Sequence, residues 1–517
     1  MDARARTAAR LRTLGRWPWH PLLMGALPVL HFWQQNFRLT GLGDGLRLLL
    51  LAALLALALM GLLRLLLRDW GRAGLVALPL MAVLVKGEAM GPAASLALLG
   101  AAAAAAVLLR WRRPDVAPAN LALNAAFLVL VAFPVGLKLR EEAAMDPPQP
   151  RPGPPAPLAT RALARPGLPD VYFILVDGLG QPATVGELFG MRQGTLTDGL
   201  RRRGARVLRA ARANYPQTGL SLASTLNAAP VPKLLEIPDP RSRDRRPLAD
   251  LVADSRVERT FRKAGYRLVT YPSGYPLARV GEPDERRRPL IAPNFLEFYV
   301  LNDGALPLVL RALGRGPADL QYALHRHRLD YILDHLPKAR QGARSDQPVF
   351  VFAHLLAPHP PFVWGPGGAP LGSRGLFSFG DGNDWTQANP GETTPYGVFW
   401  KHQAAHVMRR LEATVDAILA ASPRPPVIIV QGDHGPGSHL HWDHPGRSNL
   451  TERFGIFSAW ILPPGLEVPL REDMTAMATF PALFSGLFGE PFPVLEEGMW
   501  FARMKYPYEY FEATAGP

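Results

Sequence analysis

The chain has 517 residues, a net charge of +14 and no cysteine. This length allows more than one domain, and the lack of cysteine excludes disulfides, cysteine nucleophiles and thiolate metal sites. No nucleic-acid motif accompanies the arginines, so DNA and RNA are excluded as partners; the arginine runs face anionic lipid, phosphate or simply solvent.

The N-terminal region, residues 1–142, is predicted to be a transmembrane anchor of about five helices. The first apolar segment lacks a cleavage site and is too long for a removable signal peptide. The third is the weakest, because Lys86 and Glu88 lie at its end, but the glycines that follow favour a turn before the fourth. Each segment is near the length that a helix needs to cross hydrocarbon, and they occupy 21–37, 45–67, 73–90, 92–109 and 119–138.

The charges between these segments predict the orientation. The leading tail has five arginines against one acid, and the connections after the second and fourth segments are also basic. The alternate connections are nearly balanced. Five spans with the N-terminus inside therefore place everything after residue 140 on the extracytoplasmic side of the inner or plasma membrane. The spans contain almost no charged residues, which disfavours a transporter.

A proline-rich linker is predicted at 143–169, with seven prolines between 147 and 157. The soluble domain that follows, 170–517, is predicted to be α/β with a mostly parallel central sheet. Helical stretches alternate with apolar runs that are typical of buried strands. These runs are "DVYFILVDGLG", "YRLVTYPSG", "PVFVFAHLLAPH", "PPVIIVQGDHG" and "FGIFSAWILP".

Three of these runs end in residues suited to chemistry. Asp177 follows the first, His354 and His359 end the third, and Asp433-His434 follow the fourth. Ligands of open α/β sheets bind beyond the carboxyl ends of the strands, so these side chains are expected to converge there. Each alone has an ordinary explanation, as a turn residue, a cap or a packed histidine.

The soluble domain resembles the alkaline phosphatase/sulfatase superfamily, and more narrowly its membrane-anchored sulfatase-like hydrolases and transferases. Lipoteichoic acid synthases and lipid A phosphoethanolamine transferases belong to that wider group. The resemblance covers roughly residues 168–465 together with the multi-span anchor. It rests on "FILVDGLG", "NYPQTGLSLASTLN", "HLLAPHPPF" and "VIIVQGDHGPGS". It implies a metal site made of Asp177, Thr218, Asp433 and His434, with Gly435 completing the Asp-His-Gly triplet.

The resemblance also implies that Thr218 is the nucleophile. Thr218 follows a proline turn where a helix is predicted to begin, so free amides and the positive end of the helix dipole would face an anion. Metal coordination would lower the pKa of its hydroxyl. Two alternatives stay open: Thr218 is only an N-cap, or Ser221 is the nucleophile instead.

The remaining histidines have several candidate roles. By resemblance, His359 lies near the transferred group. His354 either faces the strand interior or joins a site for substrate or a second metal. A second cluster consists of His439, His441, Asp443 and His444. It either binds a second metal or forms a polar loop that contacts the substrate. Carboxylate, hydroxyl and imidazole ligands suit one or two ions of zinc or manganese better than calcium.

The favoured function is a metal-dependent hydrolase or transferase of the bacterial cell envelope that acts on phosphoesters. Its expected partners are the lipid bilayer and an anionic lipid or glycan phosphoester. A sulfatase is the first alternative, but formylglycine forms from Cys or Ser, usually in Cys/Ser-x-Pro-x-Arg, and the run here is "TGLSL". The second is an inactive binding protein, which the complete metal quartet disfavours.

Overall fold

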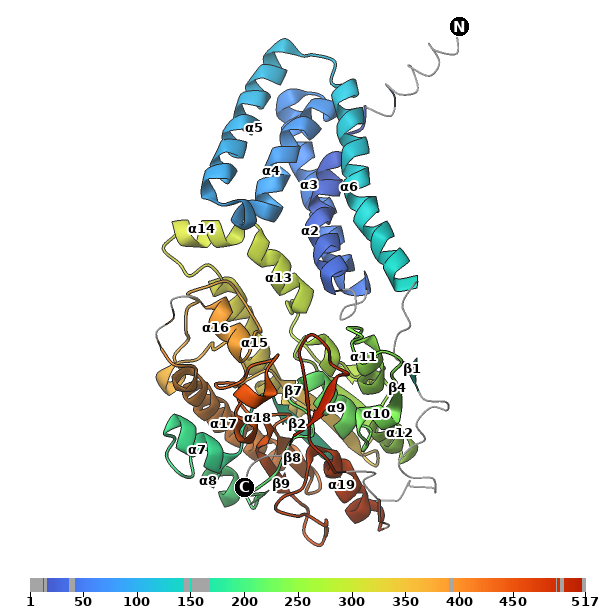
Figure 1. The fold of residues 1–517 in the computed structure, drawn as a ribbon, viewed down its shortest axis with the longest axis vertical. Coiled ribbons are helices and arrows are strands. Elements are labelled where there is room, and N and C mark those ends of the chain that lie inside the picture. Colours follow the sequence, from blue (N-terminus) through green and yellow to red (C-terminus); the bar gives the residue numbers. More distant parts are fainter. Residues whose placement is uncertain are drawn as a thin grey trace. The chain divides into compact units, whose positions relative to one another are not determined.

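The computed structural model describes Thr13 and residues 16–36, 42–143, 149–150, 167–389, 392, 394–489, 491–492 and 497–513. The chain divides into two compact units, Met1–Met145 with Pro293–Asp319, and Asp146–Ala292 with Leu320–Pro517. Both are drawn in Figure 1. Most of the predicted linker at 143–169 lies outside the described residues.

The first unit contains a helix at each of the five predicted segments. Gly91, with a φ of 85°, separates the third from the fourth, as the sequence predicts. Four of the described helices, α3 to α6, are long and apolar enough to cross a membrane, whereas α2 has only 17 residues. Five spans are therefore not confirmed. The helices are α2 His20–Asn36, α3 Leu42–Leu67, α4 Trp70–Met90, α5 Pro92–Arg112 and α6 Ala117–Ala143.

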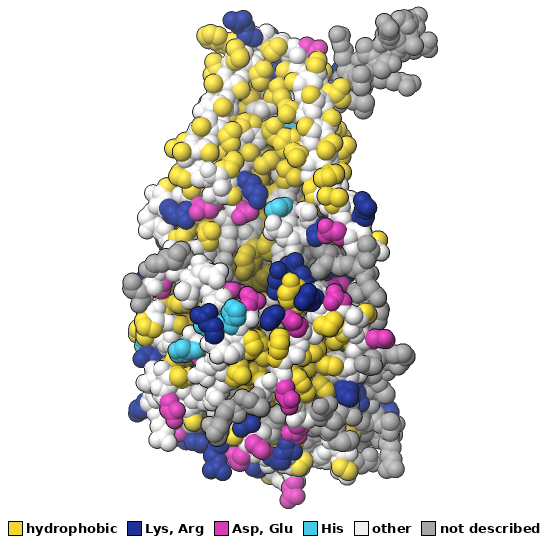
Figure 2. All heavy atoms as spheres, in the orientation of Figure 1, with side chains coloured by type: hydrophobic (Ala, Val, Ile, Leu, Met, Phe, Trp, Pro, Cys, Tyr) yellow, Lys and Arg dark blue, Asp and Glu magenta, His cyan; other side chains and the backbone are white. Residues whose placement is uncertain are grey.

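The surface of this unit is apolar. Leu65, Leu96 and Trp111 project from α3 and α5 as exposed side chains. Figure 2 shows hydrophobic side chains spread over these helices. Exposed apolar surface on this scale is typical of helices that face lipid.

A segment from far along the chain packs against these helices. It forms α13 Phe295–Asp303 and α14 Leu306–Ala312. On α13, Tyr299 stacks on Phe32 of α2 with ring centroids 5.4 Å apart. The carboxylate of Glu297 pairs with Arg47 of α3. Residues 293–319 thus belong to the membrane unit although both neighbouring parts of the chain belong to the soluble one.

The soluble unit is built on a seven-stranded sheet of order β3-β9-β8-β2-β7-β5-β6. The five strands β8, β2, β7, β5 and β6 run parallel, which confirms a mostly parallel sheet. The predicted strand in "FGIFSAWILP" is β9, and it runs antiparallel to β8. The strands are β2 Val171–Val176, β3 Arg206–Val207, β5 Arg267–Tyr271, β6 Glu285–Arg286, β7 Val349–Leu355, β8 Val427–Gln431 and β9 Ser458–Ile461.

Helices cover both faces of this sheet, which is why its strands read as continuous apolar runs. Tyr172 of β2 joins the hydrophobic cluster that includes the buried side of α17 Tyr396–Ala421. The next residue, Phe173, points to the other face and lies 5.0 Å from Phe480 of α19 Thr479–Phe488, between ring centroids. Figure 1 shows α17 and α19 on opposite sides of the strands.

The smaller elements connect the strands. Residues 246–263 form two helices, and Ser255 caps the second by accepting from the backbone amide of Glu258. The helices are α7 Pro182–Phe189, α8 Asp198–Arg202, α9 Thr218–Thr225, α10 Val231–Leu234, α11 Arg246–Ala253, α12 Arg256–Lys263, α15 Asp319–His335, α16 Asn383–Ala388 and α18 Leu450–Phe454. Two antiparallel pairs join β1 Gln149–Pro150 to β4 Leu235–Glu236, and β10 Trp500–Ala502 to β11 Tyr510–Glu512.

Candidate metal and nucleophile site

Two carboxylates lie side by side at the carboxyl ends of neighbouring strands. Asp177 directly follows β2, and its backbone amide donates to the carbonyl of Leu355 at 2.9 Å. Gly178 has a φ of 72°, a left-handed turn that favours glycine. Its amide donates to Oδ1 of Asp433 at 3.1 Å. The turn after β2 therefore fixes the carboxylate that follows β8.

The glycine of the Asp-His-Gly triplet is needed for steric reasons. A Cβ atom on Gly435 would lie 1.9 Å from the carbonyl oxygen of Glu452 in α18. The amide of Gly435 donates to the carbonyl of Arg453 at 2.7 Å. This close approach of α18 to the loop holds Asp433 and His434 at the end of the sheet.

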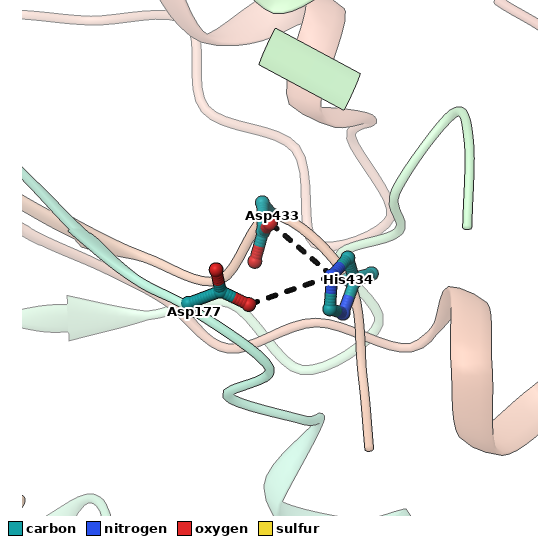
Figure 3. A group of neighbouring side chains, drawn as sticks. All are labelled: Asp177, Asp433 and His434. Atoms are coloured by element: carbon teal, nitrogen blue, oxygen red, sulfur yellow. Dashed lines mark ion pairs between the residues drawn. The ribbon is translucent and has the colours of Figure 1, made fainter. Parts of the chain in front are cut away.

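Asp177, Asp433 and His434 form a buried group whose ligand atoms lie within 4.8 Å of one another (Figure 3). Nε2 of His434 lies 3.5 Å from Oδ1 of Asp177 and 3.3 Å from Oδ2 of Asp433. Within the described chain, neither of these two buried oxygens has a hydrogen-bond partner. Burying an unsatisfied carboxylate oxygen is costly. A divalent cation would satisfy both, so the residues present fit a metal.

The protonation states also fit metal binding. Burial by itself would raise the pKa of Asp177, but the charges and hydrogen bonds of His359, His354 and His434 hold it below its usual range. Burial lowers the pKa of His434, and the charge of Arg453 lowers it further. An ionised carboxylate and a neutral imidazole are the forms that coordinate a metal.

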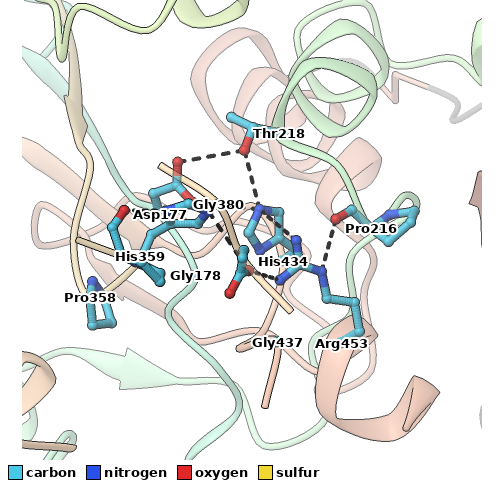
Figure 4. Close-up of polar contacts among 12 residues, drawn as sticks. Asp177, Gly178, Pro216, Thr218, Pro358, His359, Gly380, His434, Gly437 and Arg453 are labelled. Carbon is cyan, nitrogen blue, oxygen red and sulfur yellow. Dashed lines mark hydrogen bonds and ion pairs between the residues drawn. The ribbon is translucent and has the colours of Figure 1, made fainter. Parts of the chain in front are cut away.

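Thr218 lies beside this group (Figure 4). Its hydroxyl Oγ1 is 3.2 Å from Nε2 of His434 and 3.5 Å from Oδ2 of Asp177. Thr218 is the first residue of α9, and the N-cap position belongs to Gln217. The alternative that Thr218 is the N-cap is therefore wrong. The side chain of Gln217 instead donates to the carbonyl of Ala502 at 2.9 Å, which ties the turn to β10.

Ser221, the alternative nucleophile, is engaged elsewhere. Its hydroxyl donates to the backbone carbonyl of Asp433 at 2.7 Å. Ser224 in turn donates to the carbonyl of Ser221 at 2.9 Å. These contacts pack α9 against the loop after β8, so Ser221 supports the site from the backbone side.

His354 contacts Asp177 from inside the sheet. Its Nε2 lies 3.1 Å from Oδ2 of Asp177, and its Nδ1 lies 2.7 Å from the hydroxyl of Ser273. Because a carboxylate only accepts, Nε2 carries the proton and Nδ1 accepts from Ser273. His354 therefore orients Asp177 and does not face an open substrate site.

His359 is held next to Asp177 by its backbone, whose amide donates to the carbonyl of Asp177 at 3.0 Å. Its Nδ1 donates to the carbonyl of Pro360 at 2.7 Å, and its Nε2 faces Oδ2 of Asp381 at 3.7 Å. The centre of its ring is 6.0 Å from that of His434.

Sequence reasoning missed two residues of this site, Arg453 and Asp381. Arg453 is fully buried, and its Nη1 donates to Oδ2 of Asp381 at 2.6 Å. Its Nε donates to the carbonyl of Pro216 at 2.9 Å, and its Nη2 lies 3.3 Å from Nε2 of His434. Arg453 thus connects the turn before Thr218 to the buried group of Asp177, Asp433 and His434. The sequence around it, "TERFGIF", predicts an arginine exposed to solvent, and no local pattern indicates that it is buried.

The second histidine cluster does not converge. His439, Asp443 and His444 are exposed, and His441 is half-buried. Nδ1 of His439 lies 3.2 Å from Oε2 of Glu452. Among the described residues, this cluster forms no metal-type group. The structure thus separates two histidine clusters that looked alike in the sequence.

No family model matches the chain, and no curated protein matches it. Among solved structures, it is similar to the C-terminal periplasmic domain of EcEptC from Escherichia coli in complex with Zn, at 11% sequence identity and a TM-score of 0.38, over 68% of this chain and 96% of that one. It is also similar to the integral membrane protein lipooligosaccharide phosphoethanolamine transferase A from Neisseria meningitidis, at 12% sequence identity and a TM-score of 0.36. The match covers 93% of this chain and 95% of that one.

A third similar structure is a protein in the alkaline phosphatase superfamily from Vibrio parahaemolyticus, at 12% identity and a TM-score of 0.35, over 66% of this chain and 75% of that one.

Proposed function

We propose that this protein is a membrane-anchored, metal-dependent enzyme of the alkaline phosphatase/sulfatase superfamily that hydrolyses a phosphoester or transfers a phosphoryl-linked head group, with Thr218 as its nucleophile. One observation carries the proposal. The hydroxyl of Thr218 lies 3.2 Å from Nε2 of His434, beside two buried carboxylate oxygens that have no hydrogen-bond partner in the described chain.

Asp177, Asp433, His434 and Thr218 would hold one divalent cation, with zinc or manganese suited to this mixture of ligands. When bound, the cation supplies positive charge that lowers the pKa of a hydroxyl and offsets the charge of a phosphoryl group. The amide groups in the first turn of α9 add to that positive field, because they have no partner within the helix.

The reaction has two balanced halves. In the first, Oγ1 of Thr218 loses its proton to solvent and bonds to phosphorus, while the bond from phosphorus to the leaving oxygen breaks. His359, in its imidazolium form, gives that oxygen the proton of Nε2 and keeps the Nδ1 proton that bonds Pro360. In the second, water or an acceptor hydroxyl gives its proton to Nε2 of His359 and bonds to phosphorus, while the bond from phosphorus to Oγ1 of Thr218 breaks and Oγ1 takes a proton from solvent.

The site is on the extracytoplasmic side whether or not α2 crosses the membrane. The four helices α3 to α6 bring the start of α3 and the end of α6 to the same side. The opposite side has the basic connections, with Arg68 between α3 and α4, Arg72 in the first turn of α4 and Arg113 after α5. Because basic loops stay in the cytoplasm, the soluble unit lies outside. Whether helix α2 crosses the membrane changes only the side on which the N-terminus lies.

Trapping the covalent intermediate tests this function. The full-length protein is mixed with bis(p-nitrophenyl) phosphate, quenched in acid during turnover and digested. Mass spectrometry should find a p-nitrophenyl phosphate group on Thr218 within residues 214–227. The matched control is Thr218→Ala, which should give neither adduct nor turnover. Full turnover by Thr218→Ala, or faster turnover of an aryl sulfate by wild type, would remove the proposal.

A further inference from the structure

The end of α4 contains a polar motif, Lys86-Gly87-Glu88, directly after the apolar run 75–85. Both charges are matched by the returning segment. Nζ of Lys86 lies 2.6 Å from Oδ2 of Asp303, and the carboxylate of Glu88 lies 2.6 Å from Nη1 of Arg311. These two ion pairs fix both α13 and α14 to the end of the same span.

Backbone contacts hold the start of α14 close to α4. The amide of Ala305 donates to the carbonyl of Leu84 at 3.0 Å. A Cβ atom on Gly304 would lie 2.7 Å from that carbonyl oxygen, and one on Gly87 would lie 3.2 Å from Cα of Ala305. Two glycines thus allow backbone to meet backbone, and α14 is attached within the last two turns of α4.

The outer edge of α14 is apolar and exposed. Val309 is 51% exposed, and Leu313, directly after the helix, is 71% exposed. Residues four apart share one face of a helix. Because Ala305 is bonded to Leu84, Arg311 pairs with Glu88 and α4 ends at Met90, α14 is attached within about 9 Å of the end of the span, at about 1.5 Å per residue. A helix of this length reaches across the hydrocarbon core, so α14 is attached close to the boundary between acyl chains and head groups.

We propose that α14 is an interfacial helix whose edge of Val309 and Leu313 is buried in the lipid at the extracytoplasmic surface of the membrane. Its partner is the bilayer, because the edge is exposed beside α4, a helix that is long and apolar enough to cross a membrane. Arg315, which follows at the exposed end, reaches the head groups, as cationic side chains beside interfacial apolar residues do. The chain of the soluble unit is then tied to the membrane surface at residues 293–319 as well as through α6. This proposal does not depend on the reaction.

Site-directed spin labelling tests it, and the lack of native cysteine makes single labels simple. Leu313→Cys and Val309→Cys are labelled in the full-length protein in vesicles of phosphatidylethanolamine and phosphatidylglycerol. Collision with oxygen, which concentrates in lipid, is compared with collision with a water-soluble nickel chelate. Leu54→Cys, within α3, reports the acyl region, and Asp473→Cys, exposed on the soluble unit, reports water.

Labels at 313 and 309 should both show an oxygen-to-nickel collision ratio several-fold above that at 473 and below that at 54. A ratio at 313 equal to that at 473 would place the edge in water and overturn the proposal. Shielding of 313 from both reagents would also overturn it, because protein would then cover the edge. Both positions are exposed, so the labels leave the fold intact.

Discussion

Two groups of histidines in the soluble unit lie at or near the ends of strands, and they differ in burial. His434 and His354 are fully buried, and each ring lies against the carboxylate of Asp177. In the loop after β8, the side chain of His439 is 63% exposed and rests on Glu452. The number of histidines in a region therefore does not identify a metal site. Buried carboxylate oxygens that only a cation would satisfy are the better evidence.

The largest effect is expected at the nucleophile. Thr218→Ala should lower kcat/KM on bis(p-nitrophenyl) phosphate by about four orders of magnitude, because the hydroxyl of Ser221 is bonded to the backbone of Asp433 and does not replace it. Thr218→Ser should keep measurable activity, since only a methyl group is lost. The control is Ser221→Ala, whose hydroxyl bonds the backbone of Asp433 and should matter much less. Equal losses in Thr218→Ala and Ser221→Ala would contradict this assignment.

The next effect is expected at the acid after β8. Asp433→Asn keeps the shape of the side chain and an oxygen that can accept from the amide of Gly178, but it removes the charge. Activity should fall by about three orders of magnitude, because an amide is a poor ligand for a divalent cation. Circular dichroism should show an unchanged fold. An active Asp433→Asn protein would place the chemistry elsewhere.

A smaller effect is expected for His354, which touches Asp177 and not the transferred group. His354→Ala should weaken metal affinity by about 10- to 100-fold, the usual cost of losing a residue that orients a ligand. Competition with a chelator of known affinity measures this change. Excess metal should restore much of the activity, whereas it should not restore Thr218→Ala. A full loss that metal cannot rescue would mean that His354 acts on the substrate directly.

The smallest effect is expected in the exposed loop. His439→Ala and His444→Ala should change kcat by less than about two-fold and leave the metal content unchanged, because exposed side chains away from special contacts are usually tolerant. A rise in KM alone would assign the loop to substrate binding. Loss of metal in either variant would remove the contrast between the two regions.

Much of this arrangement is encoded locally. Strands buried on both faces give continuous apolar runs, so the α/β fold and the placement of Asp177 and Asp433 at strand ends follow from the sequence. The burial of Arg453 and Asp381 does not, because it depends on α18 packing against a distant loop. The return of residues 293–319 to the membrane helices was likewise missed, since two short helices give no signal of which surface they contact.

Elemental analysis of protein purified without added metal shows whether Asp177, Asp433 and His434 hold a metal beside Thr218. Wild type should contain at least one zinc or manganese ion per chain, and Asp433→Asn should contain none. Thr218→Ala and His439→Ala should stay near the wild-type content. A wild-type metal content in Asp433→Asn would mean that these three residues do not form the metal site.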